Sequence, residues 1–491
     1  MKDEKYFLEK AKENFPELHY RNIIPDITGF TGSDGDYVLL DLGEHAVGHF
    51  SFSFDKEEVF VDAPVRLNIK FGEDMREIND DFSQYDGILS KTWLQEEIIN
   101  IDFPQKIIMP RRYACRYIKI TVDRTPRPIR LFDFSFCAST SADVSVLKTI
   151  NTTDDLLKKI DNVATNTLRE CMQTFFEDGP KRDRRLWIGD LRLEALANYY
   201  TFNNLEIVKR CLYLFAAGKC NNLGFLPSFV YETPYYHSGA TYIEDYALLY
   251  VVSVCDYYEH TGDFDVVNDL LGICKSQLES FRTTLDENLI TTKQSGWYAF
   301  IDWCPGLECL VSLQGVYLYT LERFAELLKA IGDEDFEKYS SFISEVRCAS
   351  KKYLYSEKNK VFVNDFDNGQ LSVHSQVWMI LGGVITGEEA QKLLLYCLNN
   401  KSFKQPVTPY MRHYVIEAML KLEMKAEAVQ YLKKFWGGMV ELGADTFWEA
   451  YIPDDLDFSP YNDRMINSLC HAWSCTPSYF IRKYDYNFKI L

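Results

Sequence analysis

Residues 129–168 read IRLFDFSFCASTSADVSVLKTINTTDDLLKKIDNVATNTL, and the spacing of the apolar residues changes within this stretch. Its first eight residues alternate between apolar and polar side chains, which is the period of a half-buried β-strand. Further on, apolar residues recur at intervals of three and four, as at Leu156, Ile160 and Val163. That interval is typical of an amphipathic helix. We therefore predict that a β-rich domain ends and a helical domain begins near residue 140.

Other segments N-terminal to this change also have the period of a strand. Residues 47–54 (VGHFSFSF) place Phe50 and Phe52 on one face, and residues 64–71 (PVRLNIKF) alternate in the same way. Short strands of this kind, separated by glycine-rich turns, are typical of an antiparallel sandwich. We predict a β-sandwich domain over residues 1–140.

After residue 140 the helical spacing returns in many segments. Beyond the first, these are 191–217, 246–260, 313–331, 336–355, 388–399, 412–422, 424–440 and 467–481. Two of the breaks between them are Gly-Asp pairs, at 262–263 and 332–333, where glycine can end one helix and aspartate can cap the next. Consecutive helical hairpins form either an open solenoid or a closed ring. The segments are not sequence repeats, and acidic, aromatic loops interrupt them, so we predict an α/α toroid over residues 141–491.

The composition argues against several classes of partner. The formal net charge is −19, which disfavours nucleic acids and anionic membranes because both attract a basic surface. The 13 cysteines are scattered without a CxxC pair, so we predict neither a disulfide framework nor a metal site. Residues 1–20 lack the apolar segment of a signal peptide, and no apolar run reaches the ~18 residues of a membrane span. We expect a cytoplasmic protein, and the sequence leaves open whether it forms a homodimer.

The densest group of charged residues lies at 177–190, which reads EDGPKRDRRLWIGD. The candidate site residues in it are Asp178, Arg182, Asp183, Arg184, Trp187 and Asp190. One interpretation is a solvated loop whose charges pair with one another. The other is a carbohydrate subsite, because carboxylates and arginines bind sugar hydroxyls in forked geometry and tryptophan stacks on the sugar ring.

A second group lies near the C-terminus, at residues 444–451 (ADTFWEAY) and 468–473 (SLCHAW). Glu449 lies beside Trp448 and among further aromatic residues. An acid in such surroundings loses contact with water, which raises its pKa towards the range that proton transfer needs. A lone glutamate beside aromatic residues is also a common structural hydrogen-bond partner, and His471 taken alone fits a core or capping role.

Two further loops combine acids with aromatic residues. The first, YIEDY, contains Glu244 and Asp245, and the second, GWYAFIDW, contains Asp302 and Trp303. Each loop precedes a predicted helix, so helix capping is an alternative explanation for the acids. Four such groups in successive loops favour a shared site, because the loops of a closed toroid gather at one end.

These stretches resemble segments of the family 78 glycoside hydrolases, the bacterial α-L-rhamnosidases. Residues 178–190 (DGPKRDRRLWIGD) are similar to the family pattern D-C-P-x-R-[DE]-E-R-x-G-W-x-G-D, and ADTFWEAY is similar to G-[AS]-T-[ST]-x-W-E-x-W. Residues 468–473 are similar to S-L-N-H-[YA]-[AFW], and residues 36–54 resemble the sandwich that precedes the toroid in that family. The resemblance implies a β-sandwich followed by an (α/α)6 toroid, as in the six-hairpin glycosidases.

The same resemblance implies inverting hydrolysis of a terminal α-L-rhamnosyl or similar sugar, with no metal or other cofactor in the reaction. Glu449 matches the general base of the family. The positions that match its substrate-binding residues are Asp178, Arg182, Trp187, Asp190, Asp245, Trp303 and His471. From their place in the same loops, we add Arg184, Glu244, Asp302 and Trp448 to the candidate substrate-binding residues.

One position departs from the family pattern, because the family's general acid falls on Arg184. A guanidinium stays protonated and cannot protonate a leaving oxygen. Asp183 is the neighbouring acid and our candidate for that role, with Glu244 as the alternative. The departure leaves open a uronic acid substrate, which an arginine fork would suit, and a catalytically silent carbohydrate-binding homologue. A helical protein-interaction scaffold is a further alternative from a different class.

Overall fold

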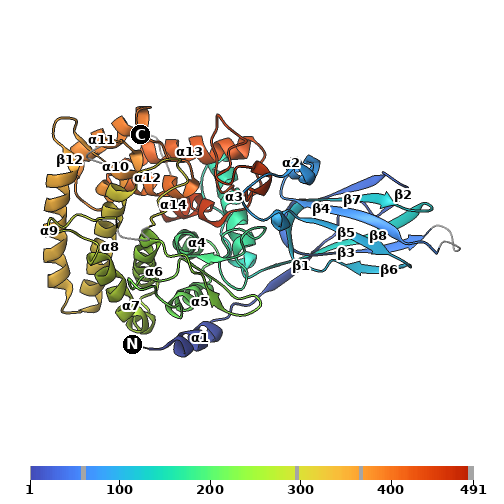
Figure 1. The fold of residues 1–491 in the computed structure, drawn as a ribbon, viewed down its shortest axis with the longest axis horizontal. Coiled ribbons are helices and arrows are strands. Elements are labelled where there is room, and N and C mark those ends of the chain that lie inside the picture. The colour runs from blue at the N-terminus through green and yellow to red at the C-terminus, as the bar shows by residue number, and fades with distance from the viewer. Residues whose placement is uncertain (1, 57–61, 294–297, 364–368, 485–491) are drawn as a thin grey trace.

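The computed structural model describes residues 2–56, 62–293, 298–363 and 369–484. They form two domains side by side, an antiparallel sheet domain and a ring of helices (Figure 1). The predicted fold class is thereby confirmed. Gly296 and Trp297, the first two residues of the predicted loop GWYAFIDW, lie outside the described residues.

The sheet domain is built from eight strands of the described chain. They are β1 (His19–Ile23), β2 (Gly29–Gly32), β3 (Tyr37–Lys56), β4 (Val65–Gly72), β5 (Glu96–Ile101), β6 (Gln105–Ile108), β7 (Tyr113–Arg124) and β8 (Ile129–Thr140). They form one connected antiparallel sheet in the order β1-β8-β3-β7-β4-β5, with β2 on β8 and β6 on β3. The long strand β3 pairs with β7 along its first half and with β8 along its second half.

These strands enclose a single apolar core. Phe50, Phe52 and Phe54 of β3 are buried in it, whereas the residues between them are partly exposed. Phe71 stacks on Tyr113 with ring centroids 3.7 Å apart. The period of two that the sequence shows is therefore the period of strands with one face towards the core.

Twelve helices of the described chain, α3 to α14, alternate between an outer and an inner layer. The outer helices are α3 (Asp155–Cys171), α5 (Leu205–Ala216), α7 (Phe264–Arg282), α9 (Phe336–Leu354), α11 (Gly387–Asn399) and α13 (Lys425–Glu441). The inner helices are α4 (Ile188–Tyr200), α6 (Glu244–Thr261), α8 (Leu310–Ile331), α10 (Val373–Leu381), α12 (Pro409–Lys421) and α14 (Pro477–Lys483). The inner helices from α4 to α12 pack on one another in chain order. Helix α14 contacts α12 through rings at His413, Tyr479 and Phe480, and it packs against both α3 and α4, which closes the ring. This closure rules out the open solenoid.

Smaller elements connect the main ones. The short strands are β9 (Leu186–Trp187), β10 (Phe229–Tyr231), β11 (His237–Ser238), β12 (Tyr355–Ser356) and β13 (Val361–Phe362). The short helices are α2 (Met75–Asn79), η1 (Phe82–Gln84), η2 (Lys91–Trp93), η3 (Val144–Val146), η4 (Arg464–Ile466) and η5 (Ala472–Ser474). Of these, α2 lies at the end of the sheet domain that meets the helical ring (Figure 1).

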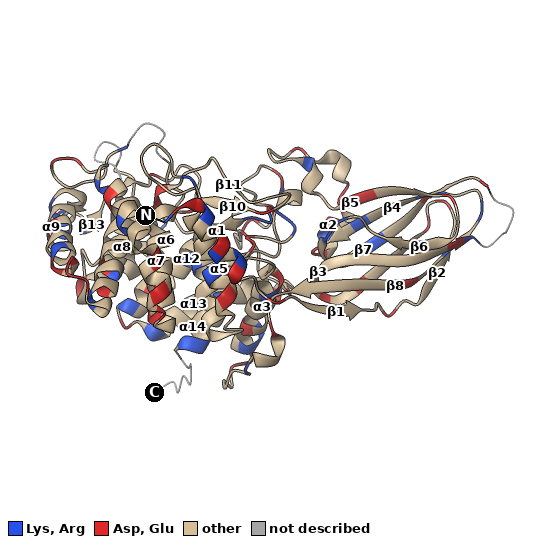
Figure 2. Ribbon diagram, turned by 90° about the horizontal axis from the view of Figure 1, so that it is seen from below, with Lys and Arg blue, Asp and Glu red and all other residues tan. Residues whose placement is uncertain are grey.

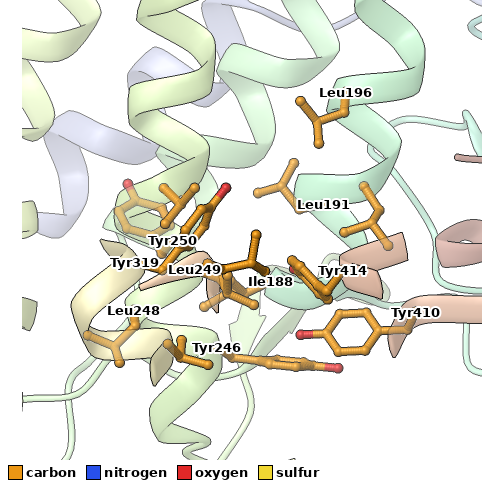
Figure 3. Packing of buried hydrophobic residues seen from close by; sticks show 14 of the residues in the cluster. Ile188, Leu191, Leu196, Tyr246, Leu248, Leu249, Tyr250, Tyr319, Tyr410 and Tyr414 are labelled. Atoms are coloured by element: carbon orange, nitrogen blue, oxygen red, sulfur yellow. The ribbon is translucent and has the colours of Figure 1, made fainter. Parts of the chain in front are cut away.

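The inner helices are buried on nearly all sides. All residues of α10 are buried, and so are all residues of α4 except the last. Figure 3 shows how Leu191 of α4, Tyr250 of α6 and Tyr414 of α12 lie in the packed interior of the ring. A helix without a polar face is expected only where other helices surround it.

The helix boundaries differ from the prediction in three respects. The predicted segment 191–217 contains two helices, because Asn204 caps α5 by accepting the backbone N–H of Ile207. Helices α7 and α10 are absent from the predicted segments, and the predicted segment 467–481 contains only the short α14 together with η5. The predicted Gly-Asp breaks are confirmed, since Gly262 and Gly332 take the left-handed conformation that ends α6 and α8.

The N-terminal helix α1 (Glu4–Glu13) packs with the helical ring, although it precedes the sheet domain in sequence. Its buried residues Phe7 and Ala11 belong to the helical core, and Phe7 stacks on Tyr213 of α5 with centroids 6.3 Å apart. The predicted sandwich segment 1–140 therefore begins with residues that lie against α5 rather than in the sheet.

The outer helices carry charged residues of both signs on their exposed sides. Figure 2 shows Asp and Glu together with Lys and Arg on α1 and on the outer helix α5. Nowhere in the described ranges does a helix combine the length and the hydropathy that crossing a bilayer requires.

Gly315 of α8 faces α10 at a close approach of the two inner helices. A Cβ atom at this position would lie 2.6 Å from the carbonyl carbon of Trp378. We expect Gly315→Ala to lower the free energy of unfolding by about 1–3 kcal/mol, because overpacking displaces a fixed backbone. The control is Gly437→Ala on α13, where Cβ would meet only the end of the Leu156 side chain, at 3.2 Å. Urea unfolding measures both, and equal stability of the two variants would contradict this account of the packing.

Candidate active site

A cavity of about 140 Å³ lies at the N-terminal ends of the inner helices. Its walls come from the segments that precede α4, α6 and α8 and from the segment between α13 and α14. The predicted site residues that line it are Asp178, Arg182, Asp183, Trp187, Asp190, Trp303, Glu449 and His471. Because helix N-termini carry partial positive charge, this end of the ring suits carboxylates.

Glu449 lies buried in the cavity wall between two hydrogen-bond donors. Its carboxylate accepts hydrogen bonds from the Arg182 guanidinium and from the Tyr461 hydroxyl. Burial alone would raise the pKa of Glu449, but Arg182, His471 and the Tyr461 hydrogen bond outweigh burial and hold the pKa below its ordinary value. The raised pKa that the aromatic neighbours predict is therefore wrong, and Glu449 is ionised at neutral pH.

Arg182 links Glu449 to Asp183. One terminal nitrogen of its guanidinium pairs with Glu449, and the other lies 3.6 Å from a carboxylate oxygen of Asp183. Its Nε donates to the carbonyl oxygen of Ile466 at 2.8 Å, and the guanidinium lies over the Tyr461 ring, 4.4 Å from the centroid. A buried guanidinium with this many partners is fixed, so it sets the spacing between two carboxylates from distant segments.

The turn after Asp178 is built around the carboxylate of that residue. Asp178 accepts the backbone N–H groups of Asp183 at 3.1 Å and of Arg185 at 3.0 Å. The side chain of Asp183 pairs with Arg185 at 3.3 Å and lines the cavity. Burial and the negative charges of Asp183 and Asp190 raise the pKa of Asp178 to about 8. Asp178 therefore keeps a proton at neutral pH.

His471 and Asp190 form a second polar group in the cavity. His471 Nε2 lies 3.3 Å from Asp190 Oδ1. Within the described residues, neither ring nitrogen of His471 nor this Asp190 oxygen has a hydrogen bond of good geometry. Burial lowers the pKa of His471, but Glu449 and Asp190 outweigh burial and raise it above its ordinary value. Buried polar atoms of this kind are available to the hydroxyl groups of a ligand.

Aromatic rings form most of the remaining wall. Phe300 stacks on Trp473 with centroids 5.7 Å apart, and Trp303 meets Tyr461 edge to face at 5.6 Å. Trp187 belongs to the same lining. Flat aromatic faces beside a few fixed polar groups suit the C–H face and the hydroxyl edge of a sugar ring.

Several lining residues are absent from the predicted set. They are Thr241, Ile243, Tyr246, Tyr298, Phe300, Tyr461 and Trp473. Most of them lie in or next to the acidic, aromatic stretches of the sequence. Their proximity to the predicted site residues could therefore have identified them. Tyr461 has no such signal, because its role depends on a hydrogen bond to Glu449 that only the folded loop creates.

Arg184 is held outside this cavity. Its guanidinium donates to the carbonyl oxygens of Pro180 and Arg112, each at 2.8 Å, where the ring meets the sheet domain. Burial and the charge of Arg112 lower the pKa of Arg184 to about 10. The side chain at the position of the expected general acid is therefore a link between the domains in this chain.

Two predicted acids, Asp245 and Asp302, lie behind the cavity wall. Asp245 accepts the backbone N–H groups of Phe300 at 2.9 Å and Ile301 at 3.2 Å, and burial raises its pKa to about 6. Asp302 accepts hydrogen bonds from His374 at 2.7 Å and from the backbone N–H of Val407 at 2.8 Å. Both carboxylates shape the loop that presents Phe300 to the cavity.

Glu244 and Trp448 also lie outside the cavity lining. Glu244 is the first residue of α6, and its backbone N–H donates to the carbonyl oxygen of Tyr298 at 3.0 Å. Trp448 lines a groove between the domains, where the Arg76 guanidinium lies 5.1 Å from its ring centroid. Glu449 therefore lines the cavity, whereas the adjacent Trp448 lines the groove.

Comparison with known proteins identifies the family. A family model described as the bacterial alpha-L-rhamnosidase 6 hairpin glycosidase domain matches residues 146–484, and one described as the glycosyl hydrolase family 78 alpha-rhamnosidase N-terminal domain matches residues 20–139. The chain belongs to glycosyl hydrolase family 78. It is therefore a glycosidase, and the resemblance seen in its sequence is confirmed. No curated protein matches the chain in sequence.

Solved structures of the family have the same architecture. The rhamnosidase from Klebsiella oxytoca with rhamnose bound is 35% identical, with a TM-score of 0.93 over 98% of this chain and 99% of that one. The family 78 rhamnosidase of Bacillus sp. GL1 is 24% identical, with a TM-score of 0.74 over 91% of this chain and 46% of that one. The α-L-rhamnosidase of Streptomyces avermitilis complexed with L-rhamnose is 15% identical, with a TM-score of 0.71 over 95% of this chain and 44% of that one. The last two comparisons concern the fold alone.

In this family 78 chain, two of the segments that carry the sequence resemblance meet in the cavity. Arg182 comes from the first segment and Glu449 from the second, and they form a buried ion pair. The closed ring brings both segments to the same end of the helical domain (Figure 1).

Proposed function

We propose that this glycosidase cleaves a terminal α-L-rhamnosyl group from a glycoside, with inversion at the anomeric carbon. The observation that carries the proposal is that Arg182 holds Glu449 and Asp183 at opposite ends of its guanidinium in one cavity. Inverting glycosidases need two carboxyl groups about 6.5–9.5 Å apart, which leaves room for a water molecule. Separation by a guanidinium fits this requirement, whereas two acids in direct contact would not.

Glu449 is the proposed general base. It is ionised at neutral pH, and its hydrogen bonds to Arg182 and Tyr461 fix its orientation. It takes a proton from a water molecule while the water oxygen attacks the anomeric carbon. The new C–O bond forms on the face opposite the bond that breaks.

Asp183 is the proposed general acid. It donates a proton to the glycosidic oxygen as the bond from that oxygen to the anomeric carbon breaks, so the aglycone leaves as an alcohol. Asp178, buried beside Asp183, keeps a proton at neutral pH. Arg182 and Arg185 stabilise the carboxylate that remains on Asp183. Asp183 regains its proton, and Glu449 loses one, by exchange with water.

A neutral deoxysugar fits the cavity better than a uronic acid does. Arg182 is the only Lys or Arg among the described residues that line it, and its guanidinium already pairs with Glu449 and Asp183. Arg184, the reason for considering a uronate, contacts backbone carbonyls elsewhere. The similarity to a rhamnosidase that holds rhamnose supports the same choice. We assign His471 and Asp190 to the sugar hydroxyls and the aromatic wall to its apolar face.

A panel of nitrophenyl glycosides tests the substrate class. We expect release of nitrophenol from the α-L-rhamnoside and none from the glucuronide. A preference for the glucuronide would establish the uronate alternative. No release from any glycoside, together with calorimetric binding of L-rhamnose, would identify a catalytically silent sugar-binding protein and contradict the proposal.

The proton held by Asp178 predicts how activity depends on pH. Burial and the charge of Asp183 raise the pKa of Asp178 to about 8, so Asp178 loses its proton as the pH rises through that value. Because the new negative charge repels Asp183 in the turn that Asp178 holds, we expect kcat/KM to fall above a pH of about 8. The measurement is the pH profile of kcat/KM with enzyme stability checked at each pH. A level profile well into the alkaline range would contradict the assignment.

A further inference from the structure

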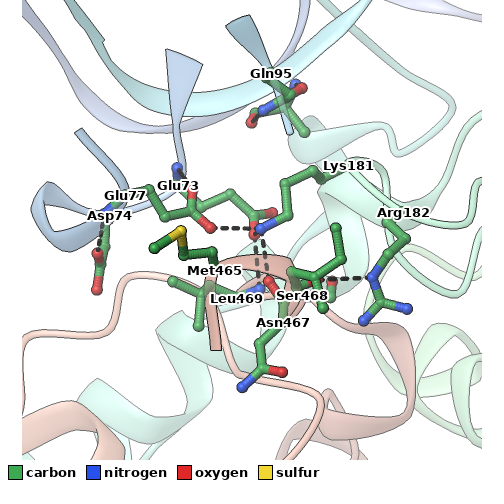
Figure 4. Close-up of polar contacts among 12 residues, drawn as sticks. Glu73, Asp74, Glu77, Gln95, Lys181, Arg182, Met465, Asn467, Ser468 and Leu469 are labelled. Atoms are coloured by element: carbon green, nitrogen blue, oxygen red, sulfur yellow. Dashed lines mark hydrogen bonds and ion pairs between the residues drawn. The ribbon is translucent and has the colours of Figure 1, made fainter. Parts of the chain in front are cut away.

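A buried ionic cluster joins the sheet domain to the two loops that carry the proposed catalytic groups. Figure 4 shows Glu73 and Glu77 of the sheet domain converging on Lys181, with Asn467 and Leu469 of the second loop beside them. Glu73 and Lys181 are each only 2% exposed. No described residue of this cluster lines the cavity, so its members act on the site only through their neighbours.

Glu73 contacts both loops with one carboxylate. It accepts the backbone N–H of Leu469 at 2.7 Å, two residues before His471. The same carboxylate oxygen lies 3.0 Å from Lys181 Nζ, and the other oxygen lies 3.3 Å from His45 Nε2. Glu73 thereby holds the backbone of one loop and a side chain of the other.

Lys181 completes the link from the loop that contains Asp183. Its Nζ donates to Glu77 of α2 and, at 2.6 Å, to the carbonyl oxygen of Asn467. Lys181 is the residue before Arg182, whose Nε donates to Ile466 on the same second loop. The two loops are therefore bound to each other and to the sheet domain.

We propose that Glu73 is a positioning residue for catalysis, through which the sheet domain fixes the loops of Asp183 and His471 relative to Glu449. The role rests on the proposed hydrolysis, because the geometry it maintains is that of the proposed acid and base. A displacement of about 1 Å in such a group costs about 10²-fold in rate. The sheet domain is then a part of the catalytic apparatus.

Charge-balanced double variants separate positioning from stability. Removing one member of a buried ion pair leaves an uncompensated charge and destabilises the fold, so Glu73 and Lys181 are changed together. Glu73→Leu with Lys181→Met removes the contact to the Leu469 N–H, whereas Glu73→Gln with Lys181→Met keeps an acceptor oxygen for it. We expect the Leu variant to lose about 10- to 100-fold in kcat with little change in KM, and the Gln variant to recover most of that loss at a similar melting temperature.

The control is Glu44→Gln at the same domain junction. Glu44 pairs with Arg169 of α3 at 2.8 Å. Neither side chain forms a hydrogen bond or ion pair with the described residues of the two loops, so kcat should stay at the wild-type value. Hydrogen exchange of the segment 466–471 gives a readout independent of substrate, and we expect faster exchange there in the Leu variant only. Wild-type kcat in the Leu variant together with unchanged exchange at 466–471 would overturn the positioning role. If the wild type cleaves no rhamnoside, the proposed function is wrong. Unchanged hydrogen exchange at 466–471 in the Leu variant would still contradict the positioning role of Glu73.

Discussion

Glu449→Gln is expected to lower kcat for an aryl α-L-rhamnoside by about 10²–10⁴-fold, which is the usual contribution of a general base. The amide has nearly the shape of the carboxylate, but it cannot take a proton from water. It also loses the charge that pairs with Arg182. Steady-state kinetics measures the loss, and calorimetry with L-rhamnose establishes that the cavity still binds sugar.

Trp448→Phe is the matched control for this prediction. Trp448 is the adjacent residue, but it lines the groove between the domains and contacts Arg76 instead of the cavity. We expect its kcat to stay within a few-fold of the wild type. Normal turnover by Glu449→Gln would show that Glu449 is not the general base. A large loss of kcat in Trp448→Phe would show that the active site is not this cavity.

Asp183→Asn is expected to have an effect that depends on the leaving group. A nitrophenolate leaves without protonation, so kcat for the nitrophenyl α-L-rhamnoside should fall only slightly. For an alkyl α-L-rhamnoside, whose leaving group needs a proton, kcat should fall about 10²–10⁴-fold. The two substrates measured on one variant therefore report on proton donation and not on folding or binding.

Asp178→Asn distinguishes the two members of the acid pair. Asp178 accepts the backbone N–H groups of Asp183 and Arg185, so its replacement should impair both substrates alike by disturbing the turn. A leaving-group dependence in Asp178→Asn, and none in Asp183→Asn, would transfer the role of general acid to Asp178 and show that our assignment is wrong.

Most of the fold follows from local periodicity in the sequence. The alternation at Phe50, Phe52 and Phe54 arises because one face of β3 meets the core, and the same spacing would identify such a strand in any protein. Helix α10 could not be predicted from periodicity. All its residues are buried, so it has no polar face and no helical period to detect.

Ring closure and domain contacts depend on interactions between distant segments. Helix α14 closes the ring by packing on α3 and α4. Helix α1 packs on α5, although the strands of the sheet domain follow it in sequence. Nothing local in either helix specifies its partner. Periodicity predicts the helices but not the closure. We predicted the ring from the lack of sequence repeats and from the acidic, aromatic loops, and the resemblance to family 78 also implies it.

The candidate site was predictable to the extent that its residues cluster in sequence. Asp178, Arg182 and Asp190 lie close together in sequence and line one cavity. Asp302 comes from an equally conspicuous stretch, yet its carboxylate binds His374 and backbone N–H groups behind the wall. Composition marks a loop as polar and aromatic, but the direction of each side chain depends on the backbone turn. Tyr461 and Glu73 act through long-range contacts and had no local signal.

The stereochemistry of the first product tests the central claim most directly. If Glu449 and Asp183 act on opposite faces of the anomeric carbon, hydrolysis of an α-L-rhamnoside must first release β-L-rhamnose. Proton NMR of the anomeric signals during the first turnovers, before mutarotation, measures this. We predict that the β-anomer appears first and the α-anomer follows at the rate of mutarotation. Initial release of the α-anomer would contradict the two-carboxylate inverting mechanism.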